Sequence, residues 1–197
     1  MKEIEITVRV LDDKATVVRK LEAAGFKKIR SFTMVDNYLC ADLKGLSKNN
    51  IAEYLRKCIL LRQINMENGI IQKLTYKNKT FKNGTTLSEE KINVEIDNIN
   101  NARALFTALN FQELISIKNT SEIYQKGSFE LAIQDIDGLG LLIEYENEND
   151  FTEQDESVIL QTKIEMLQAI KALGICTTAE FDVKKAYELV TRKLAAV

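Results

Sequence analysis

Residues 3–10 read Glu3-Ile4-Glu5-Ile6-Thr7-Val8-Arg9-Val10, a strict alternation of polar and apolar side chains. Successive side chains of a strand point to opposite faces, so this period of two predicts a strand whose four apolar residues share one face. The other face carries the two glutamates, the threonine and the arginine. A strand of this kind belongs to a sheet that is packed on one side and polar on the other.

A helix is expected after this strand, and the second half of the chain repeats the arrangement. Asp12 or Asp13 can cap the first free amides of the helix, and Gly25 is placed to end it. Residues 92–97 alternate as residues 3–10 do, and a second helical pattern follows them. A solenoid would need at least three stacked repeats. The two related halves therefore indicate a duplication within one domain that spans residues 1–197.

Short turns divide the remaining β-rich segments into hairpins. The paired runs are 59–64 with 70–76, separated by a loop that contains Asn68-Gly69, and 129–133 with 141–146, separated by residues 137–140. Asn83-Gly84 is a further turn signal. Strands joined by short turns pair in the antiparallel sense, so we expect a mainly antiparallel sheet.

The C-terminal part of the chain has a helical pattern. One helix is expected from about Thr152 to Gly174, and a second one from about Thr178 onward. The first helix carries the apolar stripe Leu160, Ile164, Leu167 and Ile170. Proline is absent and no segment resembles a flexible linker, so no domain boundary is expected. The predicted fold class is α+β, with helices packed outside a mainly antiparallel sheet.

Composition excludes several classes of protein. The 197 residues are 45% apolar and 28% charged, a balance typical of folded globular proteins. Lys and Arg total 27 against 29 for Asp and Glu, so no overall positive field exists to hold a nucleic acid. No apolar run approaches the roughly 20 residues that cross a bilayer, and no secretory signal opens the sequence. We expect a cytoplasmic protein without a nucleic-acid or membrane partner.

The side chains available for chemistry are also restricted. Histidine is absent, which removes every Ser–His or Cys–His nucleophile. Cys40, Cys58 and Cys176 are an odd number without Cys-x-x-Cys spacing, which argues against a disulfide framework and against a zinc site. Catalysis, if present, must depend on carboxylates, cations and bound metal ions.

Three strand segments place acids or amides two residues apart. The pairs are Glu3 with Glu5, Asn93 with Glu95, and Glu144 with Glu146. Each pair lies on one strand face, and for any single pair a solvated sheet face is the simpler explanation. If the three faces converge inside a closed barrel, the carboxylates repel one another unless cations or bound Mg²⁺ or Mn²⁺ neutralise them.

Basic residues on predicted strands or strand ends are the candidate partners of these acids. They are Arg62, Lys77, Lys91 and Lys118. Each of them alone also suits a solvated surface position. Together, ammonium and guanidinium groups beside metal-bound carboxylates would suit a triphosphate, because the cations hold phosphate oxygens while the metal neutralises the acids.

Several short motifs follow one another along the chain. They are Glu3-x-Glu5, Leu61-Arg62, Leu74-Thr75-Tyr76-Lys77, Lys91-Ile92-Asn93-Val94-Glu95, residues 132–140, Glu144-Tyr145-Glu146, Leu173-Gly174-Ile175 and Lys185-Ala186-Tyr187-Glu188-Leu189. In this order they resemble the motifs of the CYTH superfamily, the triphosphate tunnel enzymes that include class IV adenylyl cyclases and thiamine triphosphatases. The resemblance covers essentially the whole chain, so it is more specific than any single motif.

The resemblance implies a fold and a set of site residues. The fold would be a closed eight-stranded antiparallel β tunnel with helices outside, including two C-terminal helices. Small-molecule triphosphates would bind Arg62, Lys77, Lys91 and Lys118, while Glu3, Glu5, Glu95, Glu144 and Glu146 would hold Mg²⁺ or Mn²⁺. No single catalytic residue is assigned, and a monomer or a homodimer is compatible with this arrangement.

The resemblance also implies a reaction, which four departures from the family pattern put in question. Thr7 stands in place of a lysine, Ile64 in place of an arginine, and Asn93 and Gln134 in place of acids. Removing one well-aimed group can cost roughly a hundred- to a thousandfold in rate. Three hypotheses remain: a divergent class IV adenylyl cyclase that converts ATP to cyclic AMP and pyrophosphate, a triphosphatase acting on thiamine triphosphate or tripolyphosphate, and a nucleotide or polyphosphate binding module with impaired catalysis.

Overall fold

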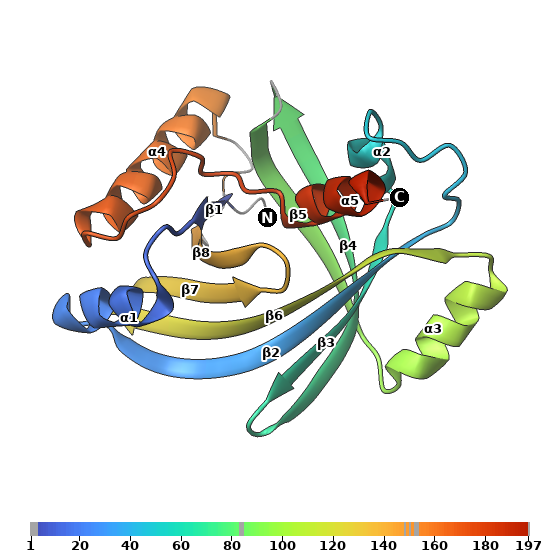
Figure 1. Cartoon of the computed structure of the whole chain (residues 1–197), viewed down its shortest axis with the longest axis horizontal. Coiled ribbons are helices and arrows are strands. Elements are labelled where there is room, and N and C mark those ends of the chain that lie inside the picture. The colour runs from blue at the N-terminus through green and yellow to red at the C-terminus, as the bar shows by residue number, and fades with distance from the viewer. Residues whose placement is uncertain (1–3, 83–84, 148, 150, 152–153, 197) are drawn as a thin grey trace.

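A curved antiparallel sheet of eight strands, flanked by helices, makes up the computed structural model of this protein (Figure 1). The structure describes residues 4–82, 85–147, 149, 151 and 154–196. The strands are β1 (Ile4–Arg9), β2 (Lys27–Cys40), β3 (Ile59–Met66), β4 (Gly69–Lys82), β5 (Thr85–Glu95), β6 (Gln112–Lys126), β7 (Phe129–Ile136) and β8 (Gly140–Asn147). The helices are α1 (Lys14–Ala23), α2 (Ile51–Arg56), α3 (Ile99–Ala108), α4 (Glu156–Ala172) and α5 (Lys185–Ala195).

Local sequence signals set the first helix and its end. The Asp13 side chain accepts a hydrogen bond from the Thr16 amide at 2.9 Å, which satisfies one of the free amides at the start of α1. Gly25 follows the helix with a φ of +86°, a left-handed conformation that glycine adopts without a Cβ penalty. The strand predicted at residues 3–10 is confirmed as β1, except for Glu3, which lies outside the described residues.

The strand order is β1-β8-β7-β6-β2-β3-β4-β5, and neighbouring strands pair in the antiparallel sense. The predicted hairpins are confirmed as β3–β4, where Met66 lies opposite Gly69, and β7–β8, where Ile136 lies opposite Gly140. The turn expected at Asn83-Gly84 lies outside the described residues. The predicted α+β class with an antiparallel sheet and helices outside is thus confirmed.

Closure of the sheet into a barrel is not confirmed. β1 and β5 stand at the two ends of the strand order and approach each other, but no ladder joins them among the described residues. The free edge of β1 is occupied by C-terminal backbone instead: Thr7 N donates to Phe181 O at 3.1 Å, and Val183 N donates to Thr7 O at 3.0 Å. Because these β1 groups already have partners, they cannot also pair with β5.

A helix side chain completes the same edge of β1. The Lys163 ammonium of α4 donates to the Glu5 carbonyl at 2.7 Å, and its side chain is only 1% exposed. Farther along, Thr178 N donates to Arg9 O at 3.0 Å and Leu11 N to Cys176 O at 2.8 Å. The edge strand is therefore covered by α4 and by residues 176–183, which hides polar groups that would otherwise invite pairing with another chain.

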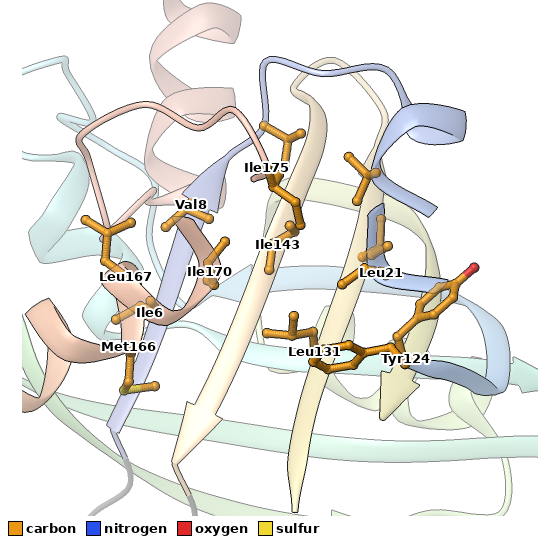
Figure 2. Close-up of a cluster of buried hydrophobic side chains, with 14 of the residues drawn as sticks. Ile6, Val8, Leu21, Tyr124, Leu131, Ile143, Met166, Leu167, Ile170 and Ile175 are labelled. Atoms are coloured by element: carbon orange, nitrogen blue, oxygen red, sulfur yellow. The ribbon is translucent and has the colours of Figure 1, made fainter. Parts of the chain in front are cut away.

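The outer face of β1, β6, β7 and β8 packs under α1 and α4 (Figure 2). Ile6 and Val8 of β1 meet Met166, Leu167 and Ile170 of α4 in this cluster. A second cluster lies beneath α2 and α5 and contains Ile51, Leu142, Val183 and Val190, all buried. Apolar side chains thus fill the outer face of this part of the sheet and the space under α2 and α5.

The buried face of α4 differs from the predicted stripe. Leu160 and Ile164 are 42% and 36% exposed, whereas Ile159 and Lys163 are buried. Leu167 and Ile170 of the predicted stripe are buried, but in the N-terminal half of α4 the buried positions lie one residue earlier, which brings Lys163 to the open edge of β1. Among the described residues, no helix has the length and apolar character that crossing a membrane requires. The cysteines are free; Cys40 and Cys58 are buried and Cys176 is exposed.

Candidate functional site

A cavity of about 760 Å³ lies inside the curve of the sheet. All eight strands contribute lining residues, together with α2 and residues 182–187 at the start of α5. Apolar groups such as Met34, Leu60 and Ile117 line part of it, and charged groups line the rest. The charged groups come from two separate regions of the sheet, which we call the acid wall and the cation wall.

The acid wall consists of Glu5 on β1 with Glu144 and Glu146 on β8. Glu5 lies directly opposite Glu146, and Thr7 lies directly opposite Glu144. Like charges in directly opposed positions destabilise a sheet unless they are neutralised. Lys91 Nζ lies 2.5 Å from Glu146 Oε1, and Thr7 Oγ1 donates to Glu5 Oε1 at 3.3 Å.

Lys185 neutralises the remaining acid of this wall. Its ammonium group forms an ion pair with Glu144 and donates to Gln134 Oε1 at 2.8 Å. Lys185 is the first residue of α5, so the C-terminal helix delivers a positive charge directly into the cavity. Glu144 and Glu146 of the acid wall are therefore each paired with a lysine.

The cation wall consists of Arg62 on β3, Lys73 and Lys77 on β4, and Lys91 on β5. Arg62 lies directly opposite Lys73, and Lys77 directly opposite Lys91. Adjacent like charges on one strand face cost stability in the absence of an anion. This arrangement fits a surface that meets a highly negative ligand.

Asp36 on β2 fixes the position of Arg62. Arg62 Nε lies 2.6 Å from Asp36 Oδ1, and Arg62 Nη2 lies 2.5 Å from Asp36 Oδ2, a bidentate pair. Burial lowers the pKa of Arg62, but the hydrogen bonds and charge of Asp36 raise it above its ordinary value overall. The guanidinium thus stays charged, and its orientation in the cavity is set by a carboxylate that is 6% exposed.

Lys73 has a different environment. Burial, followed by the nearby Arg62 charge, lowers the pKa of the Lys73 ammonium below its ordinary value. Among the described side chains, no ion pair joins Lys73 to an acid, although Glu95 lies opposite it on β5. Lys73 is therefore a cavity cation whose charge is not compensated by an ion pair with a described acid.

Comparison with known proteins places this chain in a family. A family model described as the CYTH domain matches residues 1–179. The chain belongs to the CYTH domain family. A proposed adenylate cyclase of Methanocaldococcus jannaschii is 32% identical over 188 residues, which cover 95% of this chain and 97% of that protein. The family predicted from the order of the motifs is confirmed.

Solved structures share the CYTH fold at low sequence identity. A Pyrococcus horikoshii OT3 protein has a TM-score of 0.73 at 19% identity, covering 97% of this chain and 99% of its own. A proposed adenylate cyclase of Vibrio parahaemolyticus has a TM-score of 0.69 at 14% identity, covering 98% of each chain. A Hippeastrum protein has a TM-score of 0.61 at 13% identity, with 98% and 96% coverage. These likenesses show the fold alone.

Six of the nine site residues predicted from the sequence line the cavity of this CYTH domain. They are Glu5, Arg62, Lys77, Lys91, Glu144 and Glu146. Three of the four departures from the family pattern, Thr7, Asn93 and Gln134, line it as well. The substitutions therefore change the polarity of the cavity itself.

Two predicted site residues, Lys118 and Glu95, are not brought to this cavity. Lys118 is exposed on the opposite face of β6, because its neighbours Ile117 and Asn119 take the inward positions of the alternating strand. Glu95 shares a face with Lys91 but is exposed at the end of β5, beyond the cavity lining. Glu3 lies outside the described residues.

Sequence reasoning missed Asp36, Lys73 and Lys185. Lys73 carried a usable signal, since it lies four residues before Lys77 and a period of two places both on one face. Lys185 belonged to a recognised C-terminal motif, but its approach to the cavity depends on how α5 packs. Asp36 had no local signal, because its role depends on the β2–β3 register that sets it opposite Arg62.

The described residues do not form a ready-made site for a divalent cation. Among them, no group of three or more Asp, Glu, His or Cys side chains lies close enough to hold a metal ion. Carboxylate oxygens are the donors that Mg²⁺ and Mn²⁺ prefer, but lysine ammonium groups already pair with Glu144 and Glu146. The donor chemistry is suitable for these ions, whereas the arrangement of the described side chains is not.

Proposed function

We propose that this CYTH protein binds the triphosphate group of a small molecule in the cavity and acts as a class IV adenylyl cyclase, converting ATP to cyclic AMP and pyrophosphate. The observation that supports this is the cation wall, four basic groups on one face of β3, β4 and β5 that meet the acid wall across one cavity. The 32% identical M. jannaschii relative, itself a proposed adenylate cyclase, supports the same assignment.

The proposed reaction needs position and charge more than a covalent nucleophile. The ribose 3′-hydroxyl attacks the α-phosphorus in line with the leaving pyrophosphate, and negative charge on the phosphate oxygens is stabilised by fixed cations. Arg62, held by Asp36, offers a bidentate group for two phosphate oxygens, while Lys77 and Lys91 offer point charges. The absence of histidine from the sequence is compatible with this chemistry.

In this proposal a divalent cation is needed for turnover and not for binding of the triphosphate. CYTH triphosphate tunnel enzymes generally depend on divalent metals, and Mg²⁺ or Mn²⁺ is the cofactor expected here. The cytoplasmic location, the one-domain organisation and the monomeric or homodimeric state expected from the sequence stay predictions.

Two alternatives have support of their own. A triphosphatase is favoured by the Hippeastrum structure, which is described as an adenylyl cyclase candidate with a dominant triphosphatase activity and which shares the fold. A binding module with impaired catalysis is favoured by Asn93 and Gln134, amides that line the cavity where the family pattern has acids.

The products of three incubations separate these functions. The purified protein is incubated with ATP, thiamine triphosphate or tripolyphosphate, each with Mg²⁺ or Mn²⁺. Cyclic AMP with pyrophosphate is the expected result, whereas release of orthophosphate would identify a triphosphatase. Stabilisation against heat without turnover would identify a binding module, since a ligand that binds only the native state raises its stability. The proposal would be refuted if none of the three compounds were turned over and none of them stabilised the protein.

Matched variants connect any activity to the cavity. Arg62→Ala is expected to lower turnover by roughly a hundred- to a thousandfold, the usual cost of one well-aimed electrostatic group. Lys118→Ala removes a cation from the outer face and should leave turnover unchanged. Thermal unfolding of each variant checks that it folds. Equal turnover in wild type and Arg62→Ala would place the active site elsewhere.

A further inference from the structure

We propose that the side-chain cations of this cavity hold a phosphate chain without a divalent cation, and that Lys73 is one of the groups that bind it. This inference rests on the proposed triphosphate function and concerns which charges hold the ligand. It differs from a metal-bridged arrangement, in which carboxylates bind the ion and the ion binds the phosphates.

The charge of the described lining residues favours direct binding. Seven bases line the cavity: Arg56, Arg62, Lys73, Lys77, Lys91, Lys184 and Lys185. Five acids line it: Glu5, Asp36, Glu144, Glu146 and Asp182. The surplus is positive before any metal ion is added, so an anion is attracted by the protein alone.

Lysines already fill the role that a metal ion would have at the acid wall. Lys91 neutralises Glu146 and Lys185 neutralises Glu144, and Gln134 adds no charge to the same region. A metal ion entering here would have to displace an ammonium group from a carboxylate. A phosphate chain, in contrast, can bind along the cation wall while both ion pairs stay intact.

Lys73 is a cavity cation whose charge an anion would stabilise. Its cross-strand neighbour Arg62 is bound by Asp36, so that carboxylate is already engaged, and no ion pair joins Lys73 to Glu95, which lies opposite it among the described residues. Burial and that neighbouring guanidinium lower the pKa of Lys73 below its ordinary value. The charged form of the Lys73 side chain is therefore disfavoured by its surroundings. The negative charge of a phosphate oxygen beside the ammonium would offset both effects.

Calorimetric titration with sodium tripolyphosphate tests the inference directly. The protein is freed of metal with EDTA and titrated at fixed ionic strength, first with EDTA present and then with excess Mg²⁺. Binding is expected under both conditions. Lys73→Met should weaken binding in EDTA by about ten- to a hundredfold, the value of one hydrogen bond to a charged group. Lys118→Met is the matched control and should bind as wild type does.

The possible results separate this inference from the proposed function. Binding that requires Mg²⁺ would overturn the metal-free inference and leave the triphosphate function standing. The absence of binding under both conditions would overturn both proposals. Wild-type affinity in a folded Lys73→Met protein would remove Lys73 from the site. If Lys73→Met fails to fold, Lys73→Gln replaces it, and Lys73→Arg should restore binding, since it keeps the positive charge.

Discussion

At the scale of single residues, the cavity places basic side chains next to one another, which costs stability. Arg62 has its charge matched by Asp36, whereas no ion pair joins Lys73 beside it to an acid among the described residues. Functional sites often keep groups of this kind, whose removal raises stability but lowers function. Lys73 can therefore be tested both for its effect on stability and for its effect on ligand binding.

Lys73→Met should raise the free energy of unfolding at pH 7 by roughly 0.2–1 kcal/mol, the scale of a cross-strand charge effect. Arg62, Lys77, Lys91, Asp36 and Glu95 surround the group. Because the folded-state pKa is lowered, the unfolded chain binds more protons between that pKa and the ordinary value of 10.5. The free energy of unfolding of wild type therefore rises relative to that of Lys73→Met as pH rises through this window.

Urea denaturation of wild type and Lys73→Met at pH 7 and near pH 10.5 measures this difference. The variant should be the more stable protein at pH 7, and the gap should close at the higher pH. Lys118→Met, on the outer face, should show no such change. A variant that is less stable than wild type at pH 7 would show that Lys73 is favourably paired before ligand arrives.

At the scale of elements, one lysine joins α4 to the open edge of the sheet. Lys163 is buried among the apolar residues that pack α4 against β1, yet its ammonium donates to the Glu5 carbonyl at 2.7 Å. A buried carbonyl without a partner costs free energy, so this lysine has the role that a neighbouring strand normally has. Glu5 belongs to the acid wall, and α4 thereby helps to position it.

Lys163→Met keeps most of the side-chain volume and removes the hydrogen bond. The Glu5 carbonyl is then left without its donor, and the free energy of unfolding should fall by about 1–3 kcal/mol. Chemical denaturation monitored by circular dichroism measures the change. Lys171→Met, on the exposed side of the same helix, should change stability by only a few tenths of a kcal/mol. Comparable stabilities in the two variants would mean that this contact contributes little.

At the scale of the whole molecule, the sequence was sufficient for the elements and insufficient for their relative placement. Period two and the turn residues predicted β1, β3–β4 and β7–β8, because these depend on neighbours along the chain. The face on which Lys118 lies depends on where β6 enters the sheet. A shift of one residue moves a side chain from the cavity to solvent.

Two further features depend on contacts between distant segments. The apolar stripe of α4 suggested Leu160 and Ile164 as buried, but the helix turns Lys163 inward to meet β1. The open sheet follows from residues 176–183, whose backbone occupies the β1 edge that a closed barrel would offer to β5. Neither segment carries a local pattern that reveals its partner.

Removing residues 176–197 tests whether this C-terminal segment holds the molecule together. Truncation would strip hydrogen-bond partners from Thr7 N, Arg9 O and Leu11 N, each worth about 1–3 kcal/mol if left buried. It would also remove Val183 and Val190, whose burial contributes roughly 1.5–3 kcal/mol each. These losses together match a typical total stability of about 5–15 kcal/mol, so the truncated chain should not fold cooperatively. Gel filtration and hydrogen exchange at Thr7 and Leu11 measure the outcome, with removal of residues 196–197 as the control that should behave as wild type. Cooperative unfolding of the truncated chain at the wild-type temperature would show that β1 finds another partner, and β5 would be the strand to examine.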